Sequence, residues 1–147
     1  MIGIFKKIGF YLKNKKKIFL IDSEEDFNFL LHSLENENLL AVDTEFDWRT
    51  TYFPVLSLLQ IATKNKIFLV DCLNCKNLKK LKDILEDNDR LIIFHSCRSD
   101  TTVLYTNLNI KVRNSYDIQL AEKMISGGNL KNYAYIVEKY FNFSLNK

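Results

Sequence analysis

The sequence predicts an α/β fold, in which helices pack against a mixed β-sheet. Apolar segments of strand length dominate the first half of the chain, whereas strand and helix patterns alternate in the second half. The 147 residues, of which 47% are hydrophobic and 27% charged, suit one compact domain. A single Pro and four Gly leave no Pro-rich or Gly-rich linker between domains.

The first half contains a strand, a helix and a second strand in succession. Residues 17–21 form a short apolar strand. Ser23 then supplies an N-cap, and an acidic residue stands three positions later, before apolar residues at helical spacing. Residues 39–43 form an apolar strand that ends in carboxylates. We therefore expect the first acidic side chains of interest at a strand end.

Two further strands are predicted at residues 55–63 and 66–71. Only the polar pair 64–65 separates them, so they are expected to form an antiparallel hairpin.

The second half alternates helix and strand. A helix through residues 78–85 leads to the apolar strand 91–94, and another helix begins near Arg98. After a short stretch at 112–117, two more helices are expected at 118–126 and 130–141, separated by Gly127-Gly128-Asn129.

Charge divides the chain into a basic extension at residues 1–16 and a domain at residues 17–147. Residues 1–17 hold six Lys and no acid, so the rest holds 15 basic and 18 acidic residues, a net charge of −3. Apolar residues between these lysines recur at helical spacing. A basic amphipathic helix that contacts RNA or an anionic membrane surface is one interpretation, and a frayed extension weakened by Gly3 and Gly9 is the other.

The three cysteines are expected to be free thiols. Cys72, Cys75 and Cys97 are odd in number and no signal peptide is recognised, which favours a reducing cytoplasm. Cys72 and Cys75 have the spacing of half a zinc site, but no second half-site exists, so a structural role is expected. No apolar run approaches the roughly 20 residues of a membrane span.

Asp43 and Glu45 are the first candidates for chemistry. Side chains two apart on a strand point to the same face, so these carboxylates would converge. A divalent cation is the natural counterion for such a pair, although a solvated pair at a strand end is the plain structural alternative.

Asp100 is the second candidate, in the first turn of the helix that follows strand 91–94. A capping role there is the structural alternative. Three carboxylates at one sheet edge could instead hold two Mg²⁺ or Mn²⁺ ions, a pair that activates water and stabilises a leaving oxygen in phosphodiester hydrolysis.

At these residues the chain resembles the ribonuclease D family, whose exonuclease domains have a ribonuclease H-like fold and four acidic metal ligands. The resemblance rests on the motif Val42-Asp43-Thr44-Glu45-Phe46, followed by Thr51-Tyr52-Phe53-Pro54 and Leu58-Leu59-Gln60-Ile61. It continues in Phe94-His95-Ser96-Cys97-Arg98-Ser99-Asp100 and in Tyr116-Asp117-Ile118-Gln119.

The resemblance implies that Asp43, Glu45 and Asp100 are catalytic metal ligands. It further implies that four residues hold or shape the 3′ end of the substrate: Thr44, Phe46, Gln60 and His95. His95 is alternatively a satisfied buried histidine. Asp117 matches no metal ligand of the family, and its position suggests an N-cap.

The family's third motif, a Tyr, three variable residues and a final Asp, is not found. The sequence ends at Lys147, where the segment before that motif would begin, and neither Tyr133 nor Tyr140 is followed by Asp at the required spacing. We therefore expect three of four metal ligands in this chain, an incomplete C-terminal helix, and weak metal binding.

The leading hypothesis is a metal-dependent 3′ to 5′ exoribonuclease domain that acts by a two-metal mechanism on single-stranded RNA 3′ ends, as in tRNA processing. The alternative is a catalytically impaired domain that keeps the fold and binds nucleic acid or another partner. Tyr52 and Phe53 beside the first motif are expected either to stack on bases or to lie in the core. Apolar surface left uncovered would favour a homodimer.

Overall fold

The computed structural model describes residues 16–49 and 51–145. The basic extension, for which an amphipathic helix and a frayed extension are the two interpretations, lies outside these residues except for Lys16. Lys16 donates from Nζ to the carbonyl of Thr63 at 2.9 Å, beside the start of the first strand.

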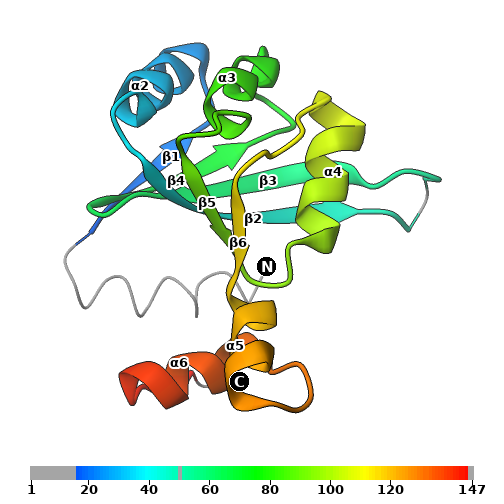
Figure 1. Ribbon diagram of the computed structural model, residues 1–147. Coiled ribbons are helices and arrows are strands. Elements are labelled where there is room, and N and C mark those ends of the chain that lie inside the picture. The colour runs from blue at the N-terminus through cyan, green and yellow to red at the C-terminus, as the bar shows by residue number, and fades with distance from the viewer. Residues whose placement is uncertain (1–15, 50, 146–147) are drawn as a thin grey trace.

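A six-stranded sheet organises the chain in the order β1-β4-β3-β2-β5-β6 (Figure 1). The central strands β4, β3 and β2 are antiparallel neighbours, whereas β1, β5 and β6 each join by parallel pairing. The sheet is therefore mixed, as predicted. Its strands are β1 (Lys17–Ile21), β2 (Leu39–Asp47), β3 (Val55–Ala62), β4 (Lys66–Asp71), β5 (Leu91–Phe94) and β6 (Ser115–Asp117).

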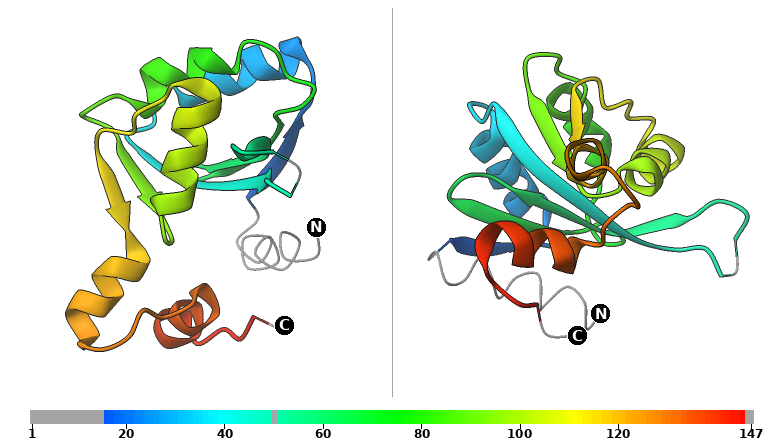
Figure 2. Two further views of the ribbon diagram at one scale, coloured as in Figure 1. Left: turned by 90° about the vertical axis from the view of Figure 1, so that its right-hand side faces the viewer. Right: turned by 60° about the horizontal axis from the view of Figure 1, so that its bottom comes forward.

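Helices lie on both faces of this sheet (Figures 1 and 2). One face, called here the helical face, is covered by α2 (Glu24–Leu34), by the 3₁₀ turn η1 (Leu78–Leu81) with α3 (Lys82–Leu85), and by α4 (Arg98–Leu108). On the opposite face, called here the open face, α5 (Ile118–Ser126) and α6 (Tyr133–Phe141) stand off from the strands. A cavity separates them from the sheet.

The core lies on the helical face. Apolar residues that alternate along the strands, such as Leu40, Val42, Ile92 and Phe94, are at most 4% exposed and form one cluster with the apolar sides of α2, η1, α3 and α4. Ser23 caps α2 by accepting from the Asp26 amide at 3.2 Å, as the sequence predicts. This face therefore fixes the strands that carry the candidate site.

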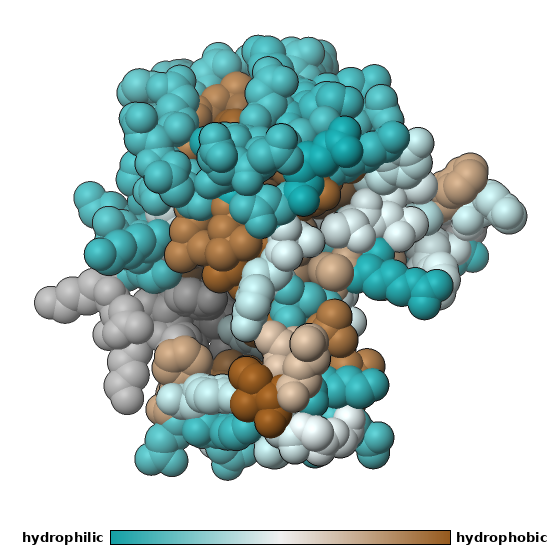
Figure 3. All heavy atoms as spheres, viewed as in Figure 1, coloured by the Kyte–Doolittle hydropathy of each residue, from teal (hydrophilic) through white to brown (hydrophobic). Residues whose placement is uncertain are grey.

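The open face carries an in-register row of apolar side chains across all six strands. Successive strand pairs bring the members of this row opposite one another, because side chains of paired residues share a face. Its members are Ile18, Ile67, Ala62, Ala41, Ile93 and Tyr116. Apolar residues are visible on both sides of the hollow between the sheet and the lower helices (Figure 3).

Some element boundaries differ from those predicted. Strand β2 continues past Asp43 to Asp47, because β3 pairs with it as far as Val55. The helix expected at 78–85 begins as a 3₁₀ turn, since Leu78 and Leu81 stand three residues apart and both are buried. Helix α6 starts three residues later than expected, where Asn132 accepts from the Tyr135 amide at 2.9 Å.

In the part of the chain that the structure describes, no helix combines the length and the apolar character that crossing a membrane requires.

Candidate functional site

Strand β2 carries the two carboxylates of the first motif. Asp43 and Glu45 alternate with the buried Thr44, so both carboxylates lie on the open face, as predicted. The pairing with β3 shifts register between Glu45 and Phe46, which marks a β-bulge directly after the motif. Bulges re-aim side chains and often occur next to active sites.

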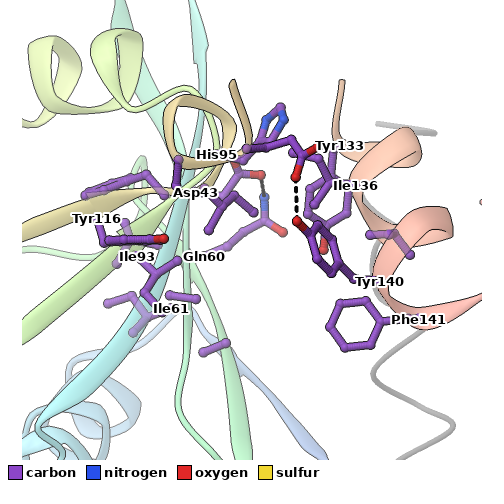
Figure 4. Close-up of a pocket in the computed structure, with 18 of the residues that line it drawn as sticks. Asp43, Gln60, Ile61, Ile93, His95, Tyr116, Tyr133, Ile136, Tyr140 and Phe141 are labelled. Carbon is purple, nitrogen blue, oxygen red and sulfur yellow. Dashed lines mark hydrogen bonds between the residues drawn. The ribbon is translucent and has the colours of Figure 1, made fainter. Parts of the chain in front are cut away.

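Asp43 contacts the neighbouring strand. Gln60, opposite Asp43 in the β2–β3 register, donates from Nε2 to Asp43 Oδ2 at 3.1 Å (Figure 4). On the same two strands, the paired Asp43 and Gln60 lie two residues from the paired Ala41 and Ala62, which belong to the apolar row. The amide of Gln60 thus orients one oxygen of the Asp43 carboxylate.

Asp100 reaches β2 from the first turn of α4 and is 6% exposed. Its Oδ1 accepts from the Thr44 amide at 2.9 Å and from the Thr44 hydroxyl at 2.6 Å. Strand β5 pairs with β2 only at residues 39–41, so beyond Ala41 this edge of β2 is not covered by β5. Asp100 takes the place that a neighbouring strand would otherwise fill.

The electrostatics link Asp100 to Asp43. Burial is the main reason that the pKa of Asp100 is raised, and the negative charge of Asp43 raises it further. The hydrogen bonds from Thr44 act in the opposite direction. Two carboxylates that repel each other in a poorly solvated place are a pair that a divalent cation would relieve.

The oxygen ligands of the site suit Mg²⁺ or Mn²⁺, but the three predicted ligands do not all come together. Within residues 16–49 and 51–145, no group of three or more His, Cys, Asp or Glu side chains is arranged to hold a metal ion. Asp43 and Asp100 are electrostatically coupled, whereas Glu45 is solvent-exposed on the same strand. These two aspartates are therefore the residues whose surroundings fit a cation best.

The four residues expected at the substrate's 3′ end separate into two pairs. Gln60 and His95 line the cavity on the open face. Thr44 is 6% exposed and bonded to Asp100, and Phe46 packs against the core cluster. Of the second pair, Thr44 holds the Asp100 carboxylate, whereas Phe46 belongs to the packing around the core.

His95 is half-buried and is the first residue of the loop between β5 and α4. Its ring stands edge-on to Tyr133 (Figure 4), with the ring centroids 5.5 Å apart. Nε2 of His95 is 3.4 Å from the carbonyl of Lys131. The imidazole thus contacts both Tyr133, the first residue of α6, and Lys131, just before that helix.

Asp117 has a larger role than the predicted N-cap. Its carboxylate does cap α5, accepting from two amides of the first turn. It also accepts from the amides of Ser96 and Cys97, at 3.0 and 2.9 Å. Ser96 has a φ of 65°, which is costly for a residue with a side chain. Asp117 therefore holds the turn that connects His95 to Asp100.

The pKa of Asp117 reflects these contacts. Burial alone would raise it, but the four backbone N–H groups that donate to the carboxylate keep the pKa below its usual value. The sequence shows the N-cap position but carries no pattern for the contact across about 20 residues to Ser96.

The cavity on the open face has a volume of about 620 Å³ and lies between β2, β3 and β5 on one side and α5 and α6 on the other. Its walls are mainly apolar and aromatic, with Asp43, Gln60 and His95 among the lining residues (Figure 4). Glu122, 2% exposed, accepts from Lys139 Nζ at 2.6 Å and from the Tyr140 hydroxyl at 2.7 Å, which ties α5 to α6. None of these α5–α6 contacts was predicted from the sequence.

Comparison with known proteins identifies the family. The sequence profile of the 3′-5′ exonuclease family matches residues 18–147. The chain belongs to the 3′-5′ exonuclease family. Ribonuclease D of Bartonella henselae is 28% identical over 129 residues, which are 87% of this chain and 32% of that protein. The exosome complex exonuclease RRP6 of Saccharomyces cerevisiae is 29% identical, over 86% of this chain and 17% of its own.

Several solved structures share the fold. Escherichia coli RNase D, described as an exoribonuclease involved in structured RNA processing, superposes with a TM-score of 0.82 at 24% identity, over 88% of this chain and 35% of its own. Trypanosoma brucei RNase D, solved in complex with RNA U12, gives 0.80 at 21% identity, over 88% of this chain and 48% of its own. Brucella melitensis NrnC, solved with bound Mg²⁺, gives 0.71 at 17% identity, over 90% and 64%.

The predicted resemblance to ribonuclease D-type exonucleases and the mixed α/β fold are thus confirmed. The chain spans about a third of the length of the ribonuclease D proteins that it matches. The similarity therefore concerns the exonuclease domain and not the full length of those proteins.

Proposed function

We propose that this chain is a metal-dependent exoribonuclease domain that removes nucleotides from the 3′ ends of single-stranded RNA. The observation that carries the proposal is the buried carboxylate of Asp100, which is hydrogen-bonded to Thr44. The charge of this carboxylate is coupled to that of Asp43, which lies on the open face of the same strand as Thr44. Relatives named ribonuclease D and the RNA-bound structure of one of them support RNA as the substrate. Exonuclease family membership supports cleavage from the 3′ end.

In this proposal Asp43 and Asp100 would hold a divalent cation, and the exposed Glu45 of the same strand would join them as a further ligand only when the cation is bound. A bound cation, or a pair of them, supplies an activated water and stabilises the leaving oxygen of the phosphodiester. Thr44 positions Asp100 through two hydrogen bonds, and Gln60 positions Asp43. His95 borders the cavity beside them, where the terminal nucleotide would enter.

The decisive experiment measures release of nucleoside monophosphates from a 3′-terminal single-stranded RNA in Mg²⁺ or Mn²⁺. Asp43→Asn removes a carboxylate at nearly constant shape and is expected to reduce the rate by at least about 100-fold. Asp83→Asn, a change at another acidic residue in the separate α3, is the matched control and should leave the rate unchanged. Turnover that Asp43→Asn leaves unaffected would refute the proposal.

The alternative, a catalytically impaired domain that keeps RNA binding, predicts a different outcome. Measurable RNA affinity together with no release of monophosphates, in either metal, would favour it.

Metal binding itself is a separate test. Isothermal titration with Mn²⁺ is expected to show weak binding to this chain, as anticipated for three ligands, and Asp100→Asn should abolish it. Equal heats for the wild type and Asp100→Asn would argue against Asp100 as a ligand.

We also propose that the chain forms a homodimer through apolar side chains of α5 and α6. Met124, Ile125 and Phe141 are 79%, 72% and 60% exposed, which is unusual for neighbouring large apolar residues on a monomer. Light scattering should give about twice the monomer mass, and Met124→Glu combined with Ile125→Glu should restore the monomer. A monodisperse wild-type monomer would contradict the dimer.

The domain is proposed to occupy residues 17–147 with a basic extension at 1–16, and the cytoplasm is its proposed location. The match over residues 18–147 supports the first point. The cytoplasmic location is supported by the three cysteines, which are all free thiols. Burial raises the pKa of Cys72 to about 12, so this thiol stays protonated and unreactive.

A further inference from the structure

The loop between β2 and β3 exposes three aromatic side chains. Trp48, Tyr52 and Phe53 are 71%, 94% and 60% exposed. The hairpin tip that they occupy extends beyond the rest of the sheet (Figures 1 and 2). Of the two expectations for Tyr52 and Phe53, a place in the core is therefore wrong.

The described part of this tip has defined internal contacts. The rings of Tyr52 and Phe53 meet edge to face at 4.9 Å, and the Thr51 hydroxyl donates to the carbonyl of Phe53 at 2.6 Å. Arg49 forms an ion pair with Asp47 at 2.7 Å, so the negative charge of the carboxylate next to the tip is balanced by a positive one. Rings that are held before binding lose less conformational entropy when a ligand stacks on them.

Asn107 of α4 anchors the base of the loop. Its Nδ2 donates to the carbonyl of Pro54 at 2.9 Å, and its Oδ1 accepts from the amide of Leu56 at 3.1 Å. The same helix carries Asp100 in its first turn. The aromatic tip and the carboxylates are thus connected twice, along β2 and through α4.

The separation between the carboxylates and the aromatic tip also suits a nucleic acid strand that contacts both. Trp48 follows Glu45 by three residues, which corresponds to about 10 Å along a strand. A nucleic acid whose 3′ end lies at the carboxylates would have its preceding bases near the tip. Aromatic rings bind such bases with little regard to sequence, because every base has a π-face.

We propose that Trp48, Tyr52 and Phe53 form a stacking platform for the bases of single-stranded RNA upstream of the 3′ end being removed. This inference rests on the proposed exonuclease function for the direction of the RNA. The platform would supply affinity that depends on bases, in addition to contacts with phosphates.

Trp48 gives a direct readout, because it is the only Trp of the chain. The full chain is titrated, without divalent metal, with a single-stranded RNA of about ten nucleotides, a length within known site sizes. Base stacking should quench the Trp48 emission. The same RNA with abasic positions upstream of its 3′ end should bind more weakly and leave the emission nearly unchanged. RNA binding, seen by anisotropy, without quenching would overturn the proposal.

Variants provide the second measurement. Tyr52→Ala with Phe53→Ala should weaken binding of this RNA about tenfold or more, the scale of losing one stacked base. The affinity for the abasic RNA should be nearly unchanged by the same substitutions. Tyr135→Ala, which removes a 41% exposed aromatic residue on α6 outside the cavity lining, is the matched control and should bind like the wild type. Equal losses for both RNAs would indicate a folding defect and contradict stacking.

These results separate the two proposals. If the chain binds RNA with quenching of Trp48 but releases no nucleotides, the exonuclease proposal fails while the stacking platform stands. If it cleaves RNA and the tip variants behave as the wild type, the platform fails alone.

Discussion

Thr44 is the residue on which the placement of Asp100 depends. Both of its polar donors, the amide and the hydroxyl, bond to the same oxygen of a carboxylate that is 6% exposed. Hydrogen bonds to a charged group are worth about 1.5–3 kcal/mol, more than bonds between neutral groups. The side chain of Thr44 is therefore a positioning group even though it does not line the cavity.

Thr44→Val tests this role, because it removes the hydroxyl and nearly preserves the shape. Loss of a residue that orients a metal ligand typically costs about 10–100-fold in metal affinity or activity. We expect the Mn²⁺ concentration for half-maximal activity to rise by that range. Thr102→Val, at a hydroxyl that donates only to the backbone of its own helix, is the control. An unchanged metal requirement would show that the amide alone positions Asp100.

Asp117 predicts a pH dependence. Its pKa is lowered in the folded protein, so it stabilises the fold above the unfolded pKa of about 3.9 and this stabilisation is lost as the pH falls through the lowered folded value. Asp117→Asn keeps one side-chain oxygen as an acceptor, but it removes the negative charge and the second acceptor oxygen that the N–H donors of the turn face, and it should cost about 2 kcal/mol at neutral pH. Urea unfolding at several pH values should show this difference shrinking below about pH 4. A difference independent of pH would rule out the ionised carboxylate as its cause.

The positions of the candidate carboxylates were predictable, but the residues that hold them in place were not. Asp43, Glu45 and Asp100 stand at strand and helix positions that periodicity reveals. The contacts of Asp117 with Ser96 and of Asn107 with Pro54 join a side chain to distant backbone. Such contacts require no particular partner side chain, so they leave no pattern in a single sequence.

At the scale of elements, strands were easier to predict than their ends. Strand β5 matches the predicted range because four apolar residues define it. Strand β2 runs on through polar residues, since the ladder with β3 and not apolar character determines its length. Strand β6 consists of Ser115, Tyr116 and Asp117 and depends wholly on pairing with β5. A strand of this kind cannot be predicted from local sequence, because its partner strand is distant in the chain.

The α5–α6 pair depends on one buried charge. Glu122 is 2% exposed, and the ammonium of Lys139, followed by the Tyr140 hydroxyl, holds its pKa below the usual value. Lys139→Met would leave this carboxylate buried beside neutral hydroxyl donors alone, which is unfavourable. We expect faster hydrogen exchange of the α6 amides in this variant.

Lys123→Met, an exposed change on α5, is the appropriate comparison and should exchange like the wild type. Unaltered exchange in Lys139→Met would mean that apolar contacts alone hold α6, through Ile136 and Val137, which are 6% and 3% exposed.

Among residues 16–49 and 51–145, the main core cluster lies on one side of the sheet. The buried cluster joins the helical face of the sheet to α2, η1, α3 and α4, while α5 and α6 lie outside that cluster. Phe68→Ala, at the centre of the cluster, should lower the free energy of unfolding by about 3–5 kcal/mol. Leu73→Ala, at a residue that is 68% exposed, should change it by less than about 0.5 kcal/mol. Urea denaturation measures both, and similar losses would mean that the core is placed wrongly.

The order of the strands also bears on how quickly the site can assemble. Strands β2, β3 and β4 are consecutive in the chain and antiparallel, so their pairing closes only short loops. Asp43 belongs to this meander, but Asp100 joins it across 56 residues and follows the parallel strand β5 in the chain, so we expect its contacts with Thr44 to form late in folding. We therefore expect a divalent cation to slow unfolding while leaving the refolding rate nearly unchanged, because its ligands meet after the barrier. A site completed so late would exist only in fully folded molecules, so under the proposed function partly folded chains would leave RNA intact.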